Sequence, residues 1–96
     1  MGAEETIKAK REQILAIARK HGVRNIKVFG SVSRGQAHAD SDVDFLIEAG
    51  PERTPFFPGG LVADLEELLG RRVDVVTEKG LNQYLRDRVL KEAVPL

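Results

Sequence analysis

The segment from residue 43 to residue 49 sets the strongest limit on the fold, because its apolar residues alternate with the period of a β-strand. One face of this strand would carry Val43, Phe45 and Ile47. The other face would carry Asp42, Asp44 and Leu46. A strand that is apolar on one face has to be covered there by other elements, so the pattern predicts a sheet with helices packed against it.

Helical and strand patterns alternate along the rest of the chain. We expect a helix over about 4–21, strands over 26–29 and 43–49, a loop over 50–60, a helix over 61–69, a strand over 72–77 and a last helix over 81–93. This order predicts an α/β (α+β) fold with one small mixed β-sheet and helices packed on it. The length of 96 residues favours a single domain spanning 1–96.

The composition excludes several classes of protein. Fifteen Lys and Arg balance fifteen Asp and Glu, and this neutral charge argues against nucleic acid as a partner. The absence of Cys excludes disulfides and thiolate metal sites. No apolar run is long enough to span a bilayer and the first residues do not resemble a signal peptide, so we expect no membrane partner and a cytoplasmic protein.

Three aspartates stand where a strand would normally carry another residue type. Asp42 and Asp44 are two positions apart at the start of one strand, and Asp74 lies between Val73 and Val75 in the next. Carboxylates are hard oxygen ligands, so a divalent cation such as Mg²⁺ would compensate for placing all three together. The alternative is structural: Asp42 caps a turn, and the other two acids pair with arginines on an open sheet face.

A glycine and a serine follow the first strand and offer a second kind of site. Gly30 and Ser31 begin a turn whose backbone N–H groups could hold a phosphate, although an ordinary strand end would look the same. Arg34 could contact a phosphate or pair with a nearby Asp, and Ser41 could contact the nucleotide or cap the next strand. Neither histidine fits a metal-binding spacing, and we expect both His21 and His38 to be solvated.

These residues together resemble a known family. Gly30-Ser31-Val32-Ser33-Arg34-Gly35 followed by Ser41-Asp42-Val43-Asp44-Phe45 is similar to the signature of the minimal nucleotidyltransferase (MNT) domains, which belong to the DNA polymerase β-type nucleotidyltransferase superfamily. The later strand Val73-Asp74-Val75-Val76-Thr77 and the tail also match in kind and order, and the resemblance covers nearly the whole chain. One departure is Ser33, where many members have Ala.

The resemblance implies a fold, a reaction and a partner. It implies a polymerase β palm-like nucleotidyltransferase fold and transfer of a nucleoside monophosphate, AMP from ATP, to an acceptor hydroxyl, with release of pyrophosphate. Asp42, Asp44 and Asp74 would be the catalytic residues and the ligands of two Mg²⁺ ions, and Gly30, Ser31, Arg34 and Ser41 would bind the nucleotide.

The same resemblance implies that the chain is the antitoxin of a HEPN/MNT toxin–antitoxin pair and modifies a tyrosine of the HEPN partner. The alternative is a catalytically silent antitoxin that neutralises its partner by binding alone. A nucleic-acid-binding module is a further rival, and the neutral charge and the few aromatic residues argue against it.

Overall fold

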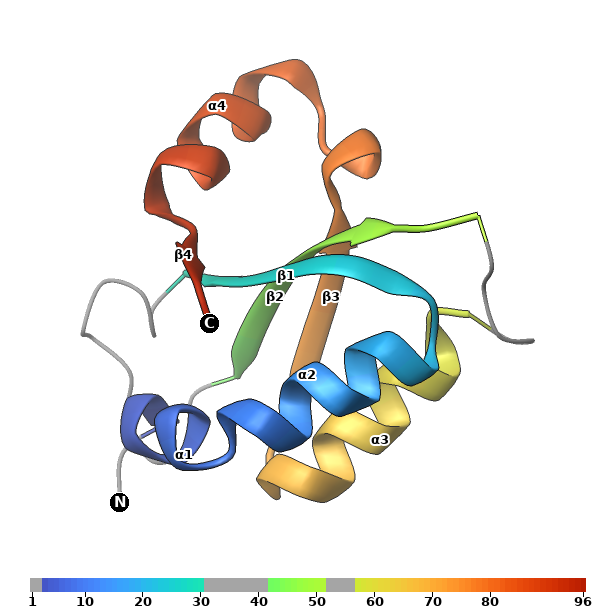
Figure 1. The fold of residues 1–96 in the computed structure, drawn as a ribbon. Helices are drawn as coiled ribbons and strands as arrows, with labels where there is room; N and C mark the ends of the chain where they lie inside the picture. Colours follow the sequence, from blue (N-terminus) through green and yellow to red (C-terminus); the bar gives the residue numbers. More distant parts are fainter. Residues whose placement is uncertain (1–2, 31–41, 52–56) are drawn as a thin grey trace.

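The computed structural model describes residues 3–30, 42–51 and 57–96, and it has helices on a mixed four-stranded sheet (Figure 1). The described elements are, in order, α1 (Ala3–Ala9), α2 (Arg11–Lys20), β1 (Val23–Phe29), β2 (Val43–Ala49), α3 (Gly59–Leu69), β3 (Val73–Thr77), the 3-10 helix η1 (Glu78–Gly80), α4 (Gln83–Glu92) and β4 (Val94–Pro95). The expected α/β fold with a small mixed sheet is confirmed.

The sheet has the strand order β3-β2-β1-β4. β1 is antiparallel to both of its neighbours, whereas β2 and β3 are parallel. Parallel neighbours need a crossover connection, and α3 supplies it between β2 and β3. β3 comes first in this strand order, so it is an edge strand among the described strands, and it begins shortly after α3 ends.

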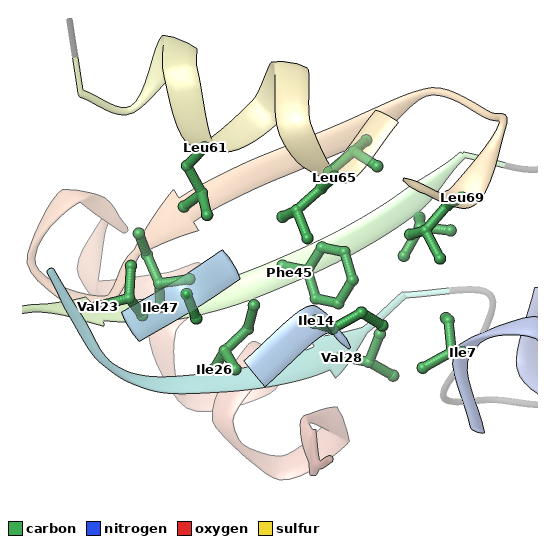
Figure 2. Close-up of a cluster of buried hydrophobic side chains, with 13 residues drawn as sticks. Ile7, Ile14, Val23, Ile26, Val28, Phe45, Ile47, Leu61, Leu65 and Leu69 are labelled. Carbon is green, nitrogen blue, oxygen red and sulfur yellow. The ribbon is translucent and has the colours of Figure 1, made fainter. Parts of the chain in front are cut away.

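The hydrophobic core lies between one face of the sheet and the helices α1, α2 and α3, as Figure 2 shows. The alternating apolar residues of β2 point into it: Val43, Phe45 and Ile47 are at most 1% exposed. Leu61, Leu65 and Leu69 of α3 recur every four residues, so they lie on one face of the helix and meet this strand. The face of β2 that sequence alternation predicted to be buried is the face that packs against helices.

Helix α4 lies on the opposite side of the sheet from α1, α2 and α3 (Figure 1). Leu46 points to that second face and is buried, although it does not belong to the core cluster on the first face. The coverage is partial, because Asp42 and Asp74 are exposed and Asp44 is half-buried. The second face is thus apolar in the middle of β2 and open at its beginning.

The first predicted helix is divided into two. The chain leaves helical geometry at Lys10, with φ −108° and ψ 17°, and no Gly or Pro in the sequence indicates this break. The Lys10 ammonium donates a hydrogen bond of 2.7 Å to the carbonyl of Leu68, near the end of α3. A tertiary contact therefore coincides with the break, and local helix propensity does not report such contacts.

Two other expectations were wrong in detail. The last helix is shorter than 81–93, and the residues expected on its apolar face include Tyr84, which is 91% exposed, and Leu85, which is 47% exposed. β4 follows directly and was not predicted, because a two-residue strand ending in Pro has no alternating pattern.

Among the described residues, no helix is both long enough and apolar enough to cross a membrane.

Candidate active site

Two of the three predicted carboxylates lie side by side. Asp44 of β2 and Asp74 of β3 are partners in the parallel register, so both side chains leave the same face of the sheet from adjacent strands. This is the face opposite the core, since the neighbours of Asp44 in β2 are the buried Val43 and Phe45. The sheet thereby places two acids next to each other near the amino ends of two parallel strands.

Gly30 packs directly against the Asp44 carboxyl group. It has φ +76°, a backbone conformation that residues with a Cβ rarely adopt. A Cβ at this position would overlap Asp44 Oδ2 and lie 3.3 Å from its Cγ. β1 pairs Phe29 with Asp44, so the chain makes its turn at Gly30 immediately above this carboxylate. The glycine of the predicted phosphate turn and the acid of the predicted metal site are therefore in contact.

Of the predicted site residues other than Gly30, Asp44 and Asp74, the structure describes only Asp42. Asp42 is exposed, two positions before Asp44 and just ahead of β2. Ser31, Arg34 and Ser41 lie outside the described residues. Within residues 3–30, 42–51 and 57–96, no group of three His, Cys, Asp or Glu side chains is placed so that it could hold a metal ion. The assignment of three metal-binding acids and four nucleotide-binding residues stays a prediction.

The donor set still suits a magnesium site. Mg²⁺ is usually bound through only one or two carboxylates, with water and substrate phosphate oxygens as its remaining ligands. Asp44 and Asp74 supply two adjacent carboxylates, and Gly30 keeps the space above Asp44 free of a side chain. The residues present therefore fit a cation that is shared with a bound phosphate.

A glutamate that the sequence did not single out contacts the strand carrying Asp74. Glu66 Oε2 of α3 accepts a hydrogen bond of 3.1 Å from the backbone N–H of Val73. On the other side of β3, the Val43 N–H donates to the Arg72 carbonyl at 2.9 Å. Acids are common in α3, which also carries Asp64 and Glu67, so the sequence offers no signal that distinguishes Glu66.

The expectation of a solvated His21 was wrong. His21 is 6% exposed, and its Nε2 lies 2.7 Å from Oδ2 of Asp64, which also contacts the Lys20 ammonium at 3.2 Å. The pKa of Asp64 lies below its usual value of 3.8. The main cause is the hydrogen bond with His21, and the next is the hydrogen bond with Lys20. This cluster joins the end of α2 to α3, and both helices pack on the core face of the sheet, opposite the face that carries Asp44 and Asp74.

The mixed sheet carries paired acids and a glycine turn on one face, and comparison with known proteins shows which family has this fold. Residues 10–96 match the family model of the nucleotidyltransferase domain, and this chain belongs to that family. The match includes both acids of the register pair and Gly30. The expectation that the chain is a nucleotidyltransferase is confirmed.

Known relatives narrow the family to its small members. The protein adenylyltransferase MntA of Thermococcus cleftensis is 46% identical over 77 residues, which cover 78% of this chain and 76% of that protein. A solved structure of a proposed minimal nucleotidyltransferase is 47% identical, covers 97% of this chain and 95% of its own, and superposes with a TM-score of 0.86. A structure of a mutant MntA–HpeT toxin–antitoxin complex is 25% identical. The match covers 90% of this chain and 70% of that one, with a TM-score of 0.73. The resemblance to MNT domains is confirmed.

Proposed function

We propose that this chain is an adenylyltransferase that moves AMP from ATP, with Mg²⁺, onto a hydroxyl of a partner protein. We further propose that the partner is a HEPN-domain toxin, that the acceptor is one of its tyrosines, and that the chain acts as an antitoxin. The observation that carries the proposal is the contact of Gly30 with Asp44, together with the register that sets Asp44 beside Asp74. A phosphate turn and a pair of acids are what nucleotidyl transfer requires in one place.

The relatives support the choice of nucleotide and partner. One close relative is named a protein adenylyltransferase, which points to AMP as the group transferred and to a protein as the acceptor. The MntA–HpeT complex has a toxin bound to a protein of this fold, which points to a toxin as the partner. The described elements are one sheet and its helices, and they include no separate domain that could hold an acceptor. A partner protein that brings its own hydroxyl to the site would meet that need.

Each site residue has a role in the proposed reaction. Asp42, Asp44 and Asp74 would hold Mg²⁺, with two ions expected, and the bound metal would stabilise negative charge on the phosphates and at the acceptor oxygen. Gly30 and Ser31 would hold the triphosphate by backbone and hydroxyl donors, and Arg34 and Ser41 would add contacts to it.

The transfer itself needs little covalent work from the protein. The acceptor oxygen forms a bond to the α-phosphorus of ATP, the bond from that phosphorus to the β-phosphate oxygen breaks, and pyrophosphate leaves. Asp74 accepts the proton of the acceptor hydroxyl or aligns that hydroxyl for attack. Most of the acceleration then comes from orientation and from stabilising charge.

Transfer of label from ATP tests the proposal. The chain is incubated with α-labelled ATP, Mg²⁺ and the proposed HEPN-domain partner, and label on that partner is measured. Asp44→Ala, which removes one of the paired acids, should lower the transfer rate by at least about a hundredfold, because charge stabilisation at the phosphate is lost. Asp87→Ala, at an exposed position of α4, is the matched control and should leave the rate unchanged.

Three outcomes distinguish an active enzyme, a silent antitoxin and a wrong assignment of the site. Label on a tyrosine of the partner that disappears with Asp44→Ala and persists with Asp87→Ala supports the enzyme. Neutralisation of the toxin without any label, equal in wild type and Asp44→Ala, identifies a silent antitoxin instead. Label that is transferred equally by wild type and Asp44→Ala contradicts the assignment of the site.

A further inference from the structure

The peptide group between Arg72 and Val73, one residue before Asp74, is held from both sides. Its carbonyl, that of Arg72, accepts from the Val43 N–H at 2.9 Å, and its N–H, that of Val73, donates to Glu66 Oε2 at 3.1 Å. The carbonyl and the N–H of one trans peptide point in opposite directions. β2 therefore takes the inner side of this peptide group, and Glu66 takes the side that faces away from β2.

Among the strands that the structure describes, none lies on that outer side, because β3 is at the edge of the sheet. An edge N–H normally bonds to water and leaves the strand free to tilt or twist. Here a carboxylate replaces the water, and a hydrogen bond to an ionised acceptor is stronger than one between neutral groups. Glu66 thus gives the Val73 N–H a hydrogen bond of the kind that a further strand would otherwise supply.

The position of Glu66 is unfavourable for its own helix. It lies in the last turns of α3, where the negative end of the helix dipole disfavours an acid, and α3 has no basic residue in its last turn. The bond to Val73 compensates for this local disadvantage. A residue that conflicts with its helix and bonds to the strand next to a predicted catalytic acid has a role outside the helix.

We propose that Glu66 is a positioning residue for Asp74: by fixing the Arg72–Val73 peptide from the outer edge, it sets the position of the Asp74 carboxylate relative to Asp44. This inference rests on the proposed function for its catalytic consequence. The held peptide includes the Cα of Val73, which is bonded through one further peptide to Asp74, so a shift of the held peptide is transmitted to Asp74 through Val73. Displacement of a reacting group by about 1 Å is enough to reduce a rate by up to about a hundredfold.

Three substitutions distinguish length from charge at this position. Glu66→Gln keeps the length and an acceptor oxygen, so transfer should stay within about threefold of wild type, since the hydrogen bond is retained. Glu66→Asp keeps the charge on a shorter side chain, and it should lose about tenfold or more in kcat, as should Glu66→Ala, with the KM for ATP unchanged. Glu67→Ala, at the exposed neighbouring position, is the control and should behave like wild type.

A double-mutant cycle excludes a purely structural role. If Glu66 acts through Asp74, then Glu66→Ala should have no further effect on the residual rate of Asp74→Ala. A residue that only stabilises the fold would lower the melting temperature and would reduce both rates by the same factor. Equal additional losses in both backgrounds, or transfer by Glu66→Asp at the wild-type rate, would overturn the proposal.

Hydrogen exchange provides a readout that does not depend on transfer. The amide of Val73 should exchange slowly in wild type and Glu66→Gln, and at least about tenfold faster in Glu66→Asp and Glu66→Ala. Absence of label transfer by the wild-type protein would count against the proposed function alone, because the exchange rates still test the constraint on β3. Unchanged exchange at Val73 in Glu66→Ala would refute the positioning role even if the wild-type protein transfers AMP.

Discussion

Gly30 is required by its backbone conformation and also by its closeness to the Asp44 carboxyl group. Its positive φ favours glycine at any turn of this kind, and a Cβ here would also overlap the Asp44 carboxyl group. The sequence motif could predict a glycine turn, yet it could not show that the turn touches the second acid. That contact depends on the register of β1 with β2, which pairs Phe29 with Asp44.

Substitution of Gly30 by alanine tests this closeness. Gly30→Ala should lower the free energy of unfolding by about 1–2 kcal/mol through backbone strain, and it should also displace the Asp44 carboxylate. AMP transfer should fall by at least about tenfold, because Asp44 leaves its position. Chemical denaturation and the label assay measure the two effects separately.

Gly70 provides the matched control, because it has φ +65° but nothing within 4 Å of an added Cβ. Gly70→Ala should therefore lose similar stability and keep its transfer rate. If Gly30→Ala transfers AMP as fast as Gly70→Ala, the contact with Asp44 has no part in the reaction.

At the scale of helices and strands, periodicity predicted most elements but not their tertiary contacts. β2 and α3 have strong patterns, and the structure has them over 43–49 and 59–69, within two residues of the expected bounds. β1 extends to Val23, three residues before the predicted start, because exposed Arg24 and Asn25 at a register shift interrupt its alternation. Register itself could not be predicted, and it alone brings Asp44 beside Asp74.

The contact between α2 and α3 gives a prediction about pH. Asp64 has a lowered pKa, so its ionised form stabilises the folded state at pH values above the usual 3.8, and this contribution is lost as the pH falls through the lowered value. Asp64→Asn should therefore lower the melting temperature near neutral pH, because the bonds to His21 and Lys20 weaken. The difference from wild type should shrink when the pH is taken below 3.8.

Thermal unfolding of both proteins between neutral pH and pH 3 measures this difference. Glu67→Gln, a neutral substitution at an exposed position of the same helix, should match wild type throughout. A difference between Asp64→Asn and wild type that stays constant over the whole range would show that ionisation of Asp64 does not stabilise the fold.

For the whole molecule, the hydrophobic core and the proposed active site lie on opposite faces of one sheet. The first face meets α1, α2 and α3 in the core, and the second presents Asp44 and Asp74. The alternation of β2 predicted this division, since each core residue in it is next to a residue of the other face. Substitutions on the two faces should therefore have different signatures.

Leu65 tests the first face, since it is fully buried at the centre of α3. Leu65→Ala should lower the free energy of unfolding by about 2–5 kcal/mol, through lost apolar burial and the cavity left behind. This is a large part of the total for a small domain, and the transfer rate of the folded fraction should not change. Leu85→Ala, at a position that is 47% exposed, should change stability by no more than about 0.5 kcal/mol in urea titrations.

The pairing of β4 with β1 has a consequence for how the protein is made. β1 lies inside the sheet, and among the described residues Val94 and Pro95 of β4, which follow much later in the chain, are what pairs with one of its two edges. A nascent chain leaving the ribosome has β1 well before β4, so β1 lacks this neighbour until α4 has also been made. During that interval the unpaired backbone groups of β1 can bond to any extended segment nearby. The speed of translation and the access of chaperones should therefore affect how much of this protein folds correctly.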